Sequence, residues 1–529
     1  MKTITKQKTK EESEMKKTLK KALALTAAAA MMTGSLITGP VSAQESDRTL
    51  NIGIGSEISN LVPMSNNVAV SNRDGLIVFA LYDPLLWYNT ETNELEPWIA
   101  TEWSHNEEGT EWYFTIRDDI VFHNGDPMTA EDVAWSINLI PENPVVTDQN
   151  IPGFDRAEAV DDTHITVYME EPFASTDNFF ASYHMVMLDK SYQEEVGWEG
   201  YIEHPIGTGP YKFVDRAIGS YVSMEANEDY WQGAPEIKKV NLNIIPDANS
   251  QLLSLETGEV DVLQNVSLQN CEMVEGMDGY EVSYCTADTV AYIQWGSQSQ
   301  LNTDENLRLA ICAAIDPEAI NTVLNKGHTE AVSCMIAPGL RCRPEDGTFT
   351  TIPAYDPEKA QEYLDNSNYD GNPIVIVVPS GAKEEAVCQV IQGNLQNIGM
   401  SVELKAVDGA THQTLLSEGN FDISVYSGLP SLYDCNLLYQ LFMPGTQNYE
   451  NSKSEYKEEL GELGQASAVE MDEEARTEIF RQMIEIMNTH VLSIPLYQDC
   501  NTFCYSTDVA NVKAIPGTNV RVDGWSWAE

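Results

Sequence analysis

The stretch "HPIGTGPYKF" (204–213) places two glycines and a proline directly before an aromatic residue, a pattern that can bind phosphate. Glycine amides cradle a phosphate when they lead into the N-terminus of a helix. Here Gly207, Gly209 and Pro210 lead into "YKFV" (211–214), which is strand-like, and no GK[ST] follows. We therefore interpret the stretch as a tight turn or a chain crossover with a structural role.

Other catalytic patterns are missing from the sequence. There is no GxSxG nucleophile elbow and no HExxH zinc motif, and the eight histidines are scattered. His105 and His123 flank a predicted strand pair and could meet, although surface positions are the simpler interpretation. Because carboxylates are so abundant, the sequence does not decide whether two of them form a glycosidase-type acid/base pair. The missing motifs alone are weak evidence against an enzyme, and the sequence as a whole leads us to expect no enzyme activity, no cofactor and no metal site.

Nine cysteines leave at least one thiol unpaired. Cys334 lies close in sequence to Cys342, and Cys500 lies close to Cys504. Either pair suits a disulfide, and free buried thiols suit the sequence equally well. No CxxC is present, which argues against a zinc ribbon or a thioredoxin-type site.

The length and charge of the chain restrict its class. A chain of 529 residues is too long for one hydrophobic core, so two or three domains are expected. The formal net charge is -52, from 30 basic and 82 acidic residues. Such an acidic protein repels phosphates, so nucleic acid and anionic membrane surfaces are excluded as partners.

The N-terminus has the composition of a secretory signal peptide. Lysines at 16, 17, 20 and 21 precede the apolar run 22–32, and Val41-Ser42-Ala43 supplies small residues before a cleavage point. We predict cleavage near Ala43, with Met15 as an alternative start, and export to the periplasm, the cell surface or the medium. A lipoprotein would need a cysteine at the cleavage site, but the first cysteine is Cys271.

The elements that must position any site alternate between strand and helix. "TLNIGIG" (49–55) and "THITVYM" (163–169) predict strands, and Thr129 with Asp132 forms a capping-box pattern that begins a helix. From about residue 285 the pattern becomes α/β.

One βαβ unit is predicted in this second region. It consists of the strand 373–380, a helix with Val387, Ile391 and Leu395 on one face, and the strand 401–407. A later helix carries the buried stripe of Phe480, Met483, Ile484 and Met487.

Several blocks in a characteristic order resemble the extracellular solute-binding proteins of ABC importers, in the large family that carries oligopeptides, dipeptides and nickel. The resemblance runs from about Leu50 to near the C-terminus. The blocks that carry it are "LYDPLLWY" (81–88), "EPWIATEWS" (96–104), "TEWYFTIRDDIVFHNGDPMTAEDVAWSI" (110–137), "HPIGTGPYKF" (204–213), "EANEDYWQGAPEIKKVNLNII" (225–245), "LETGEVDV" (255–262), "LRLAICAAID" (307–316), "AYDPEKAQEYL" (354–364) and "LQNIGMSVEL" (395–404).

The resemblance implies an α/β, periplasmic-binding-protein-like fold with two lobes, a hinge and an extra domain. Lobe I would comprise 44–88, 206–272 and 496–529, the extra domain 89–205, and lobe II 273–495. "SIPLYQ" (493–498) would be the return crossing between the lobes. The partners implied are a peptide or small-molecule ligand and a membrane permease, and we expect a monomer.

The ligand-specific region of the family corresponds here to "VYSGLPSLYDCNLLYQLF" (425–442). The aspartate that binds the amine of a peptide in the family falls near Leu429-Pro430 and is absent. Gly296 stands where the family usually has asparagine. A modified peptide, an amine, a glycan or another small nutrient all remain candidate ligands. Cavity candidates, chosen because loops at lobe edges face the cleft, are Ser56, Glu57, Trp295, Tyr426, Tyr433, Asp434 and Tyr497.

The resemblance predicts capture of a solute between two lobes and its delivery to a permease. Two alternatives are an exported hydrolase with an unrecognised carboxylate pair, and a receptor for peptide signals on the same fold. Clustered acids with raised pKa values in the cleft would favour the hydrolase.

Overall fold

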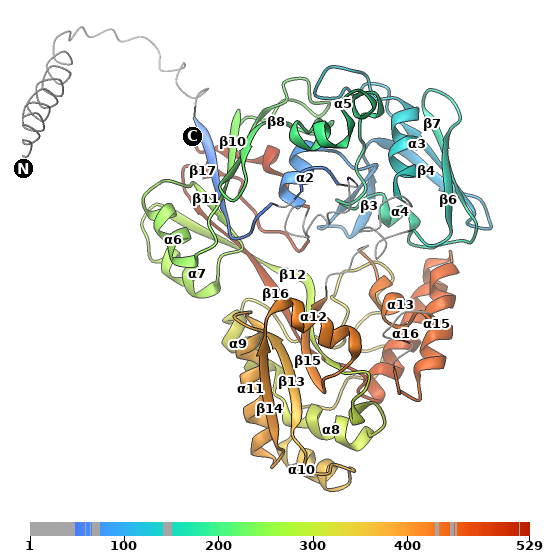
Figure 1. Ribbon diagram of the computed structural model, residues 1–529, viewed down its shortest axis with the longest axis vertical. Coiled ribbons are helices and arrows are strands. Elements are labelled where there is room, and N and C mark those ends of the chain that lie inside the picture. Colours follow the sequence, from blue (N-terminus) through green and yellow to red (C-terminus); the bar gives the residue numbers. More distant parts are fainter. Residues whose placement is uncertain are drawn as a thin grey trace, which may run out of the picture. The chain divides into compact units, whose positions relative to one another are not determined.

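A ten-stranded sheet runs through the computed structural model and joins two lobes (Figure 1). Its strand order is β14-β13-β15-β12-β16-β11-β1-β10-β9-β8. The structure describes residues 48–58, 60–63, 65, 75–140, 151–428, 433–444, 449, 452–517 and 519–529. The predicted signal segment and the residues Leu429-Pro430 lie outside these residues.

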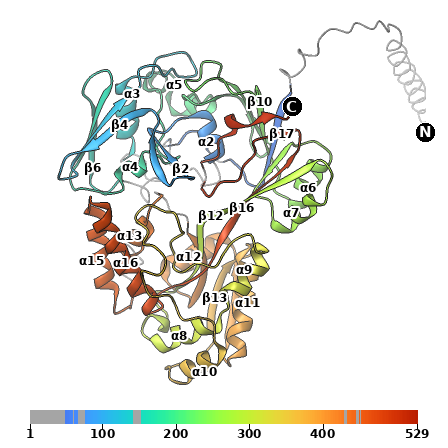
Figure 2. The same ribbon diagram turned by 180° about the vertical axis from the view of Figure 1, so that it is seen from behind.

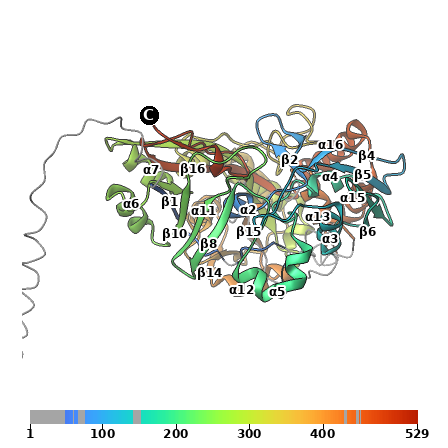
Figure 3. The ribbon, with the colours of Figure 1, turned by 90° about the horizontal axis from the view of Figure 1, so that it is seen from above.

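Lobe I, as we use the name, is built around one half of this sheet and a separate four-stranded sheet, β4-β5-β7-β6. Figure 3 shows the small sheet at the end of the lobe away from α6 and α7. The elements of lobe I are β1 (Thr49–Ile54), α2 (Gly75–Leu81), β2 (Leu86–Asn89), β3 (Glu94–Pro97), β4 (Ala100–His105), β5 (Glu111–Ile116), α3 (Ala130–Asn138), β6 (Phe154–Ala159), β7 (His164–Met169), α4 (Thr176–Phe179), α5 (Lys190–Glu203), β8 (Tyr211–Ala217), β9 (Tyr221–Ala226), β10 (Lys239–Ile244), α6 (Ala248–Glu256), β11 (Val262–Gln264), α7 (Leu268–Glu275), β17 (Val509–Ala510) and β18 (Ser526–Trp527).

Lobe II is built around the other half of the sheet, in which β13 pairs in parallel with both β14 and β15. In Figure 1, α13, α15 and α16 lie to the right of this half-sheet, α11 lies to its left, and α10 lies at the bottom of the lobe. The elements of lobe II are α8 (Glu305–Ala314), α9 (Pro317–Asn325), α10 (Pro357–Asp365), β13 (Ile374–Pro379), α11 (Glu384–Asn397), β14 (Val402–Val407), α12 (Gly409–Glu418), β15 (Ile423–Gly428), α13 (Asn436–Phe442), α15 (Lys457–Val469) and α16 (Glu473–Thr489).

Two antiparallel strands cross from one lobe to the other, β12 (Tyr280–Trp295) and β16 (Ile494–Ser506). In lobe I, β16 pairs with β11, and in lobe II, β12 pairs with β15 (Figure 2). The return crossing predicted at 493–498 is thus the first part of β16. The outward strand begins well before the apolar stretch "TVAYIQWG" (289–296), because residues 280–286 pair with β16.

Local sequence signals account for many of the elements. Thr129 accepts a hydrogen bond from Asp132 N, and the Asp132 carboxylate accepts one from Thr129 N, which is the predicted capping box. The predicted βαβ unit is β13-α11-β14, with Val387, Ile391 and Leu395 buried. The predicted α/β class is confirmed. The residue limits of the three domains stay a prediction.

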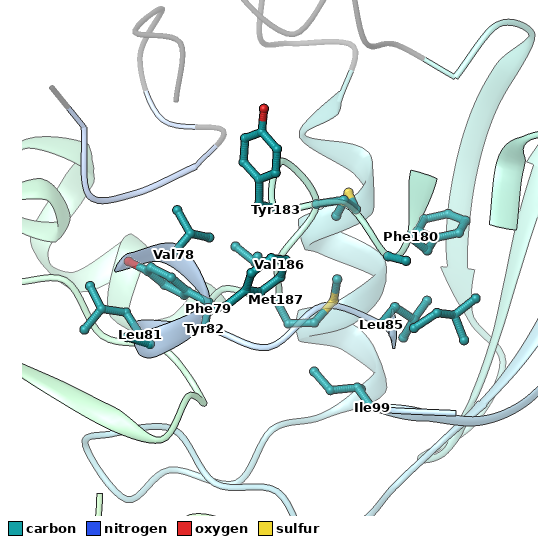
Figure 4. Close-up of a cluster of buried hydrophobic side chains, with 14 of the residues drawn as sticks. Val78, Phe79, Leu81, Tyr82, Leu85, Ile99, Phe180, Tyr183, Val186 and Met187 are labelled. Carbon is teal, nitrogen blue, oxygen red and sulfur yellow. The ribbon is translucent and has the colours of Figure 1, made fainter. Parts of the chain in front are cut away.

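The core of lobe I explains the glycines of "HPIGTGPYKF". Side chains of α2 and of the segment from Phe180 to Met187 pack together there (Figure 4). Gly207 and Gly209 press against the backbone at Leu81, where a Cβ on Gly207 would lie 2.1 Å from the carbonyl oxygen. Thr208 donates a 2.9 Å hydrogen bond to the buried Asp83 carboxylate. The stretch then enters β8, so it is a close-packed turn and no phosphate loop.

The nine cysteines are all free. Cys500 and Cys504 lie four residues apart on β16, and the shortest Sγ–Sγ distance is instead 3.6 Å, between Cys504 and Cys271 of α7. Both thiols of that pair are buried. Neither disulfide considered from the sequence is formed.

Candidate functional site

The two lobes meet along a seam that combines ring stacking with ion pairs. Tyr88, at the end of β2 in lobe I, stacks on Tyr433 of lobe II with ring centroids 4.3 Å apart. Tyr433 donates a 2.5 Å hydrogen bond to Asn519, which belongs to the C-terminal segment of lobe I. Tyr433 also has a left-handed backbone, with φ of 55°, a conformation that costs free energy outside glycine. One of the predicted ligand residues is therefore held at the seam by both lobes.

Asp434, the next residue, is fully buried in a network that includes lobe I. Its Oδ2 accepts hydrogen bonds from Ser175 (2.6 Å) and Asn178 (3.1 Å), and it forms a 3.0 Å ion pair with Arg476 of α16. Arg476 also donates to Ser175. The carboxylate of Asp434, one of the predicted ligand residues, is thus already bonded to other groups of the protein.

A second ion pair joins the lobes next to this network. Arg341 of lobe II lies 2.9 Å from Asp177 of α4 and also pairs with Glu473 at the start of α16. Burial lowers the pKa of the Arg341 guanidinium, but the two carboxylates outweigh that effect and the pKa is raised. Arg341 therefore stays charged and connects lobe I to α16.

The remaining predicted candidates are spread over the molecule. Trp295 is 7% exposed, and its indole donates a 2.9 Å hydrogen bond to the carbonyl of Val491 within lobe II. Tyr497 is 1% exposed, and its hydroxyl has no hydrogen-bond partner. Tyr426 is 41% exposed on β15, beside Tyr292. Ser56 and Glu57 lie after β1, half-buried and exposed respectively. Tyr433 and Asp434, neighbours in the chain, lie together at the seam, whereas Trp295 and Tyr497 share a hydrophobic cluster within lobe II.

Asp288, which the sequence analysis did not single out, lies where β12 passes between the lobes. The pairing of β12 with β16 shifts register between Thr286 and Val290, and Asp288 lies inside this irregularity. Its amide donates a 3.1 Å hydrogen bond to the carbonyl of Pro516. In its carboxylate, the enclosed Oδ1 receives no hydrogen bond. A lone aspartate next to the apolar strand "TVAYIQWG" (289–296) is the signal that could have revealed it.

Burial shifts the pKa values of Asp288 and His184, two groups with an enclosed atom that has no hydrogen-bond partner. It raises the pKa of Asp288 to about 7, with a backbone hydrogen bond acting weakly in the other direction. It lowers the pKa of His184 to about 3, and the Nε2 of this imidazole is enclosed without a partner. Buried polar atoms are nearly always paired in folded proteins, so each unpaired one calls for an explanation. Ser427 Oγ and Asn436 Oδ1 are also buried without a hydrogen-bond partner.

A separate cavity of about 100 Å³ lies within lobe II at the far end of β12. Its walls mix apolar and hydroxyl side chains and include Tyr292, Trp295, Met335, Phe442, Ser452 and Ser493. Of the seven predicted ligand residues, Trp295 alone lines it. This volume holds a few waters or a very small solute.

Among the described residues, no group of three or more histidine, cysteine, aspartate or glutamate side chains is placed to hold a metal ion. Within the same part of the chain, no helix has both the length and the apolar character needed to span a membrane.

Comparison with known proteins gives a consistent result. The family described as bacterial extracellular solute-binding proteins, family 5 Middle, matches residues 94–450. The nickel-binding periplasmic protein of Escherichia coli is 23% identical over 83% of this chain and 87% of its own length. The glutathione-binding protein GsiB of Pectobacterium atrosepticum is 24% identical over 72% of this chain and 73% of its own.

Solved structures have the same fold. NikA from Brucella suis, in complex with Fe(III)-EDTA, superposes with a TM-score of 0.82 at 19% identity and covers 91% of this chain and 100% of that one. CtaP from Listeria monocytogenes superposes with a TM-score of 0.81 at 21% identity, covering 91% and 99% of the two chains. The predicted two-lobe fold of periplasmic binding proteins is therefore confirmed.

Proposed function

The chain belongs to the bacterial extracellular solute-binding proteins of family 5, and we propose from this membership that it captures a peptide-like or other small nutrient between its lobes. It then delivers the solute to the membrane permease of an ABC importer. The observation that carries the proposal is the family match over residues 94–450 on a fold whose lobes are joined by β12 and β16.

The architecture suits capture by closure. Two crossing strands give the lobes a connection that can bend, and closing domains around a solute is a common use of such a hinge. The seam carries contacts that form only when the lobes meet, the ring stack of Tyr88 on Tyr433 and the pair of Arg341 with Asp177. These contacts would add to the stability of the closed form.

We propose Tyr433 and Tyr426 as ligand contacts, with Ser56 and Glu57, which follow β1 in lobe I. Tyr433 lies at the seam, and Tyr426 is exposed on β15, which leads toward it. Trp295 and Tyr497 are buried within lobe II and would need repacking to reach a solute. Asp434 would have to break its ion pair with Arg476 to contact a solute, so we assign it a structural role at the seam.

The solute class follows only broadly from the relatives. Their names describe binding of nickel in one case and glutathione in another, and a third is a probable D,D-dipeptide-binding protein from Escherichia coli. A peptide, a modified peptide or another small polar nutrient is the proposal for this chain. We propose neither a resident metal nor a cofactor.

Catalysis is not part of the proposal. A hydrolase would need two free carboxylates near each other. Asp288 and Asp434 both act electrostatically on Tyr88, but Asp434 is already ion-paired with Arg476. We further propose that residues 1–43 act as a signal peptide, that the mature protein is exported, and that it works as a monomer.

The test is to purify the protein and identify by mass spectrometry any solute that co-purifies. A thermal-shift screen of peptides, amines and glycans should then give a solute that raises Tm and is recovered chemically unchanged, because binding to the folded state alone stabilises it. Recovery of a cleaved or altered solute would contradict pure binding. Failure of every co-purified and screened solute to raise Tm would overturn the proposed function.

A further inference from the structure

A pair of buried thiols lies at the base of the crossing strands in lobe I. The sulfur atoms of Cys271 in α7 and Cys504 in β16 are 3.6 Å apart, and neither side chain is exposed to solvent. Cys504 pairs with Leu263 of β11 and Val282 of β12, so it occupies the part of β16 that belongs to lobe I. The two cysteines are 233 positions apart in the chain. Their contact is therefore a product of the tertiary fold.

The surroundings of the pair are apolar. Both cysteines lie in a small hydrophobic cluster that also contains Leu255, Val260 and Val274. In such a core a thiol is a weak hydrogen-bond donor and contributes little beyond its packing. A disulfide bond is also apolar and fills nearly the same space. Oxidation would therefore add a covalent link without enclosing a charge or an unpaired donor.

Geometry favours this pairing over one between neighbours on the same strand. An S–S bond is about 2 Å long, so its formation moves each sulfur by less than about 1 Å, which small side-chain rotations provide. Cys500 precedes Cys504 on β16, and an extended strand places their Cα atoms about 13 Å apart. Cα atoms more than about 7 Å apart cannot be bridged without moving the backbone. Cys271 is thus a partner within reach of Cys504, and Cys500 is not.

We propose that Cys271 and Cys504 form a disulfide bond when the protein meets a thiol oxidant, so that the pair is a site of oxidative modification. The oxidant is a low-molecular-weight disulfide, the chemical class of oxidised glutathione. Exported proteins meet oxidising conditions, whereas the cytosol keeps thiols reduced. This modification goes beyond the proposed solute binding and does not depend on the identity of the solute.

The reaction is a thiol–disulfide exchange in two steps. The thiolate of one cysteine attacks the S–S bond of the oxidant, which forms a mixed disulfide and releases one thiol of the oxidant. The second cysteine, as a thiolate, attacks the protein sulfur of the mixed disulfide and releases the other thiol. Both protein thiols are oxidised, the S–S bond of the oxidant is reduced, and the two protons pass to the released thiols. Because both sulfurs are buried in the folded protein, the exchange takes place while the chain folds, before α7 packs over β16.

The helix that carries Cys271 also contacts lobe II. Glu272 of α7 forms a 3.5 Å ion pair with Lys326 at the end of α9. Glu275 of α7 accepts a 3.0 Å hydrogen bond from Tyr284 of β12, and Tyr284 stacks on His328 of lobe II with ring centroids 3.9 Å apart. A disulfide from α7 to β16 therefore anchors a helix that contacts both a crossing strand and lobe II. It also closes a ring of chain that contains lobe II, and such a cross-link stabilises mainly by restricting the unfolded chain.

Peptide mapping tests this pairing. The full protein is unfolded in urea and refolded in a mixture of reduced and oxidised glutathione. The remaining thiols are then blocked with iodoacetamide, and the protein is digested without reduction. We expect mass spectrometry to find the peptide of Cys271 joined to the peptide of Cys504. We also expect the oxidised protein to have a Tm about 5 °C above that of the fully reduced protein.

Two variants serve as controls. Cys504→Ala removes one sulfur of the pair and should abolish the Tm difference between oxidised and reduced protein. Cys388→Ala removes an equally buried thiol from α11 in lobe II and should keep that difference.

Recovery of Cys271 and Cys504 as separately blocked peptides, or joined to other cysteines or to glutathione, would overturn the proposed pairing. A Tm difference of unchanged size in Cys504→Ala would do the same. If Cys504→Ala does not fold, the peptide map of the parent protein decides alone. Solute binding is measured separately and stands or falls on its own test.

Discussion

Arg476 and Asp434 form a salt bridge in which neither side chain is more than 3% exposed, with Nη1 and Oδ2 3.0 Å apart. Both side chains also contact Ser175 of the other lobe. The pair belongs to lobe II, where Ser467 and Asn436 also bond to it, and lobe I adds hydrogen bonds from Ser175 and Asn178 to the carboxylate. The stability of the protein and the contact between its lobes therefore depend on the same buried charges.

The first prediction concerns this pair. Asp434→Ala leaves the Arg476 guanidinium buried without its counter-ion, so we expect the free energy of unfolding to fall by about 3–5 kcal/mol. Urea denaturation of the ligand-free protein measures it. A loss below about 1 kcal/mol, accompanied by lost solute binding, would show that Asp434 is a ligand contact instead.

The second prediction concerns contact between the lobes. Asp177→Asn removes the charge that Arg341 meets across the seam, so we expect solute to dissociate about five times faster, as a partly buried pair is worth about 1 kcal/mol. Stopped-flow release measures the rate. The control is Arg481→Ala, which breaks a pair with Glu478 inside α16 and should leave the rate unchanged. Equal rates in all three proteins would refute the role of this ion pair.

The third prediction is a dependence on pH. The folded-state pKa of Asp288, about 7, lies above its ordinary value of 3.8, so its contribution to stability is complete below about pH 4 and lost as pH rises through 7. Asparagine cannot ionise. Asp288→Asn should therefore be more stable than the parent by about 1–2 kcal/mol at pH 8 and equally stable near pH 4. The magnitude at pH 8 is reduced for solvent screening, because the residue is half-buried.

Calorimetric Tm values of the ligand-free proteins between pH 4 and 8.5 give this difference. Among the described residues, Tyr88 of β2, Tyr433 and Cys285 are titratable groups near the carboxylate. Burial raises the pKa of both Tyr88 and Cys285, so neither gains charge in this range. A difference between the proteins that does not change with pH would refute the assignment.

The fourth prediction concerns the turn at 207–210. Gly207→Ala would place a methyl group 2.1 Å from the carbonyl oxygen of Leu81, so we expect a loss of more than about 2 kcal/mol in unfolding free energy. Gly393→Ala is the matched control, since that position in α11 has open space and alanine favours helix by about 0.5–1 kcal/mol. A tolerated Gly207→Ala would mean that the turn can move away from α2.

The sequence predicted what depends on short-range patterns. The capping box of Thr129 with Asp132 and the apolar faces of α11 and α16 follow from spacing alone, and the structure has them. The fold itself followed from the order of family blocks. The first half of β12 was not predicted from the sequence. Its residues Tyr280–Thr286 include several polar side chains, and their pairing partners on β16 lie more than 200 residues away in the chain.

The candidate site was predicted less well. Tyr433 and Asp434 were chosen, but the left-handed backbone of Tyr433 and the approach of Arg476 depend on tertiary packing. Trp295 and Tyr497 were chosen as aromatics near lobe edges, yet both face the interior of lobe II. Asp288 was passed over because an acid beside a strand looks like an ordinary turn residue until its missing partner is seen.

The irregularity between Thr286 and Val290 has a mechanical consequence. Along most of the crossing, β12 and β16 share a ladder that resists bending, whereas the ladder is interrupted over this stretch and shifts register again between Ala291 and Tyr292. Asp288 lies inside that interruption. The lobes can therefore bend about this short stretch with fewer strand hydrogen bonds to distort than in the paired parts of the crossing.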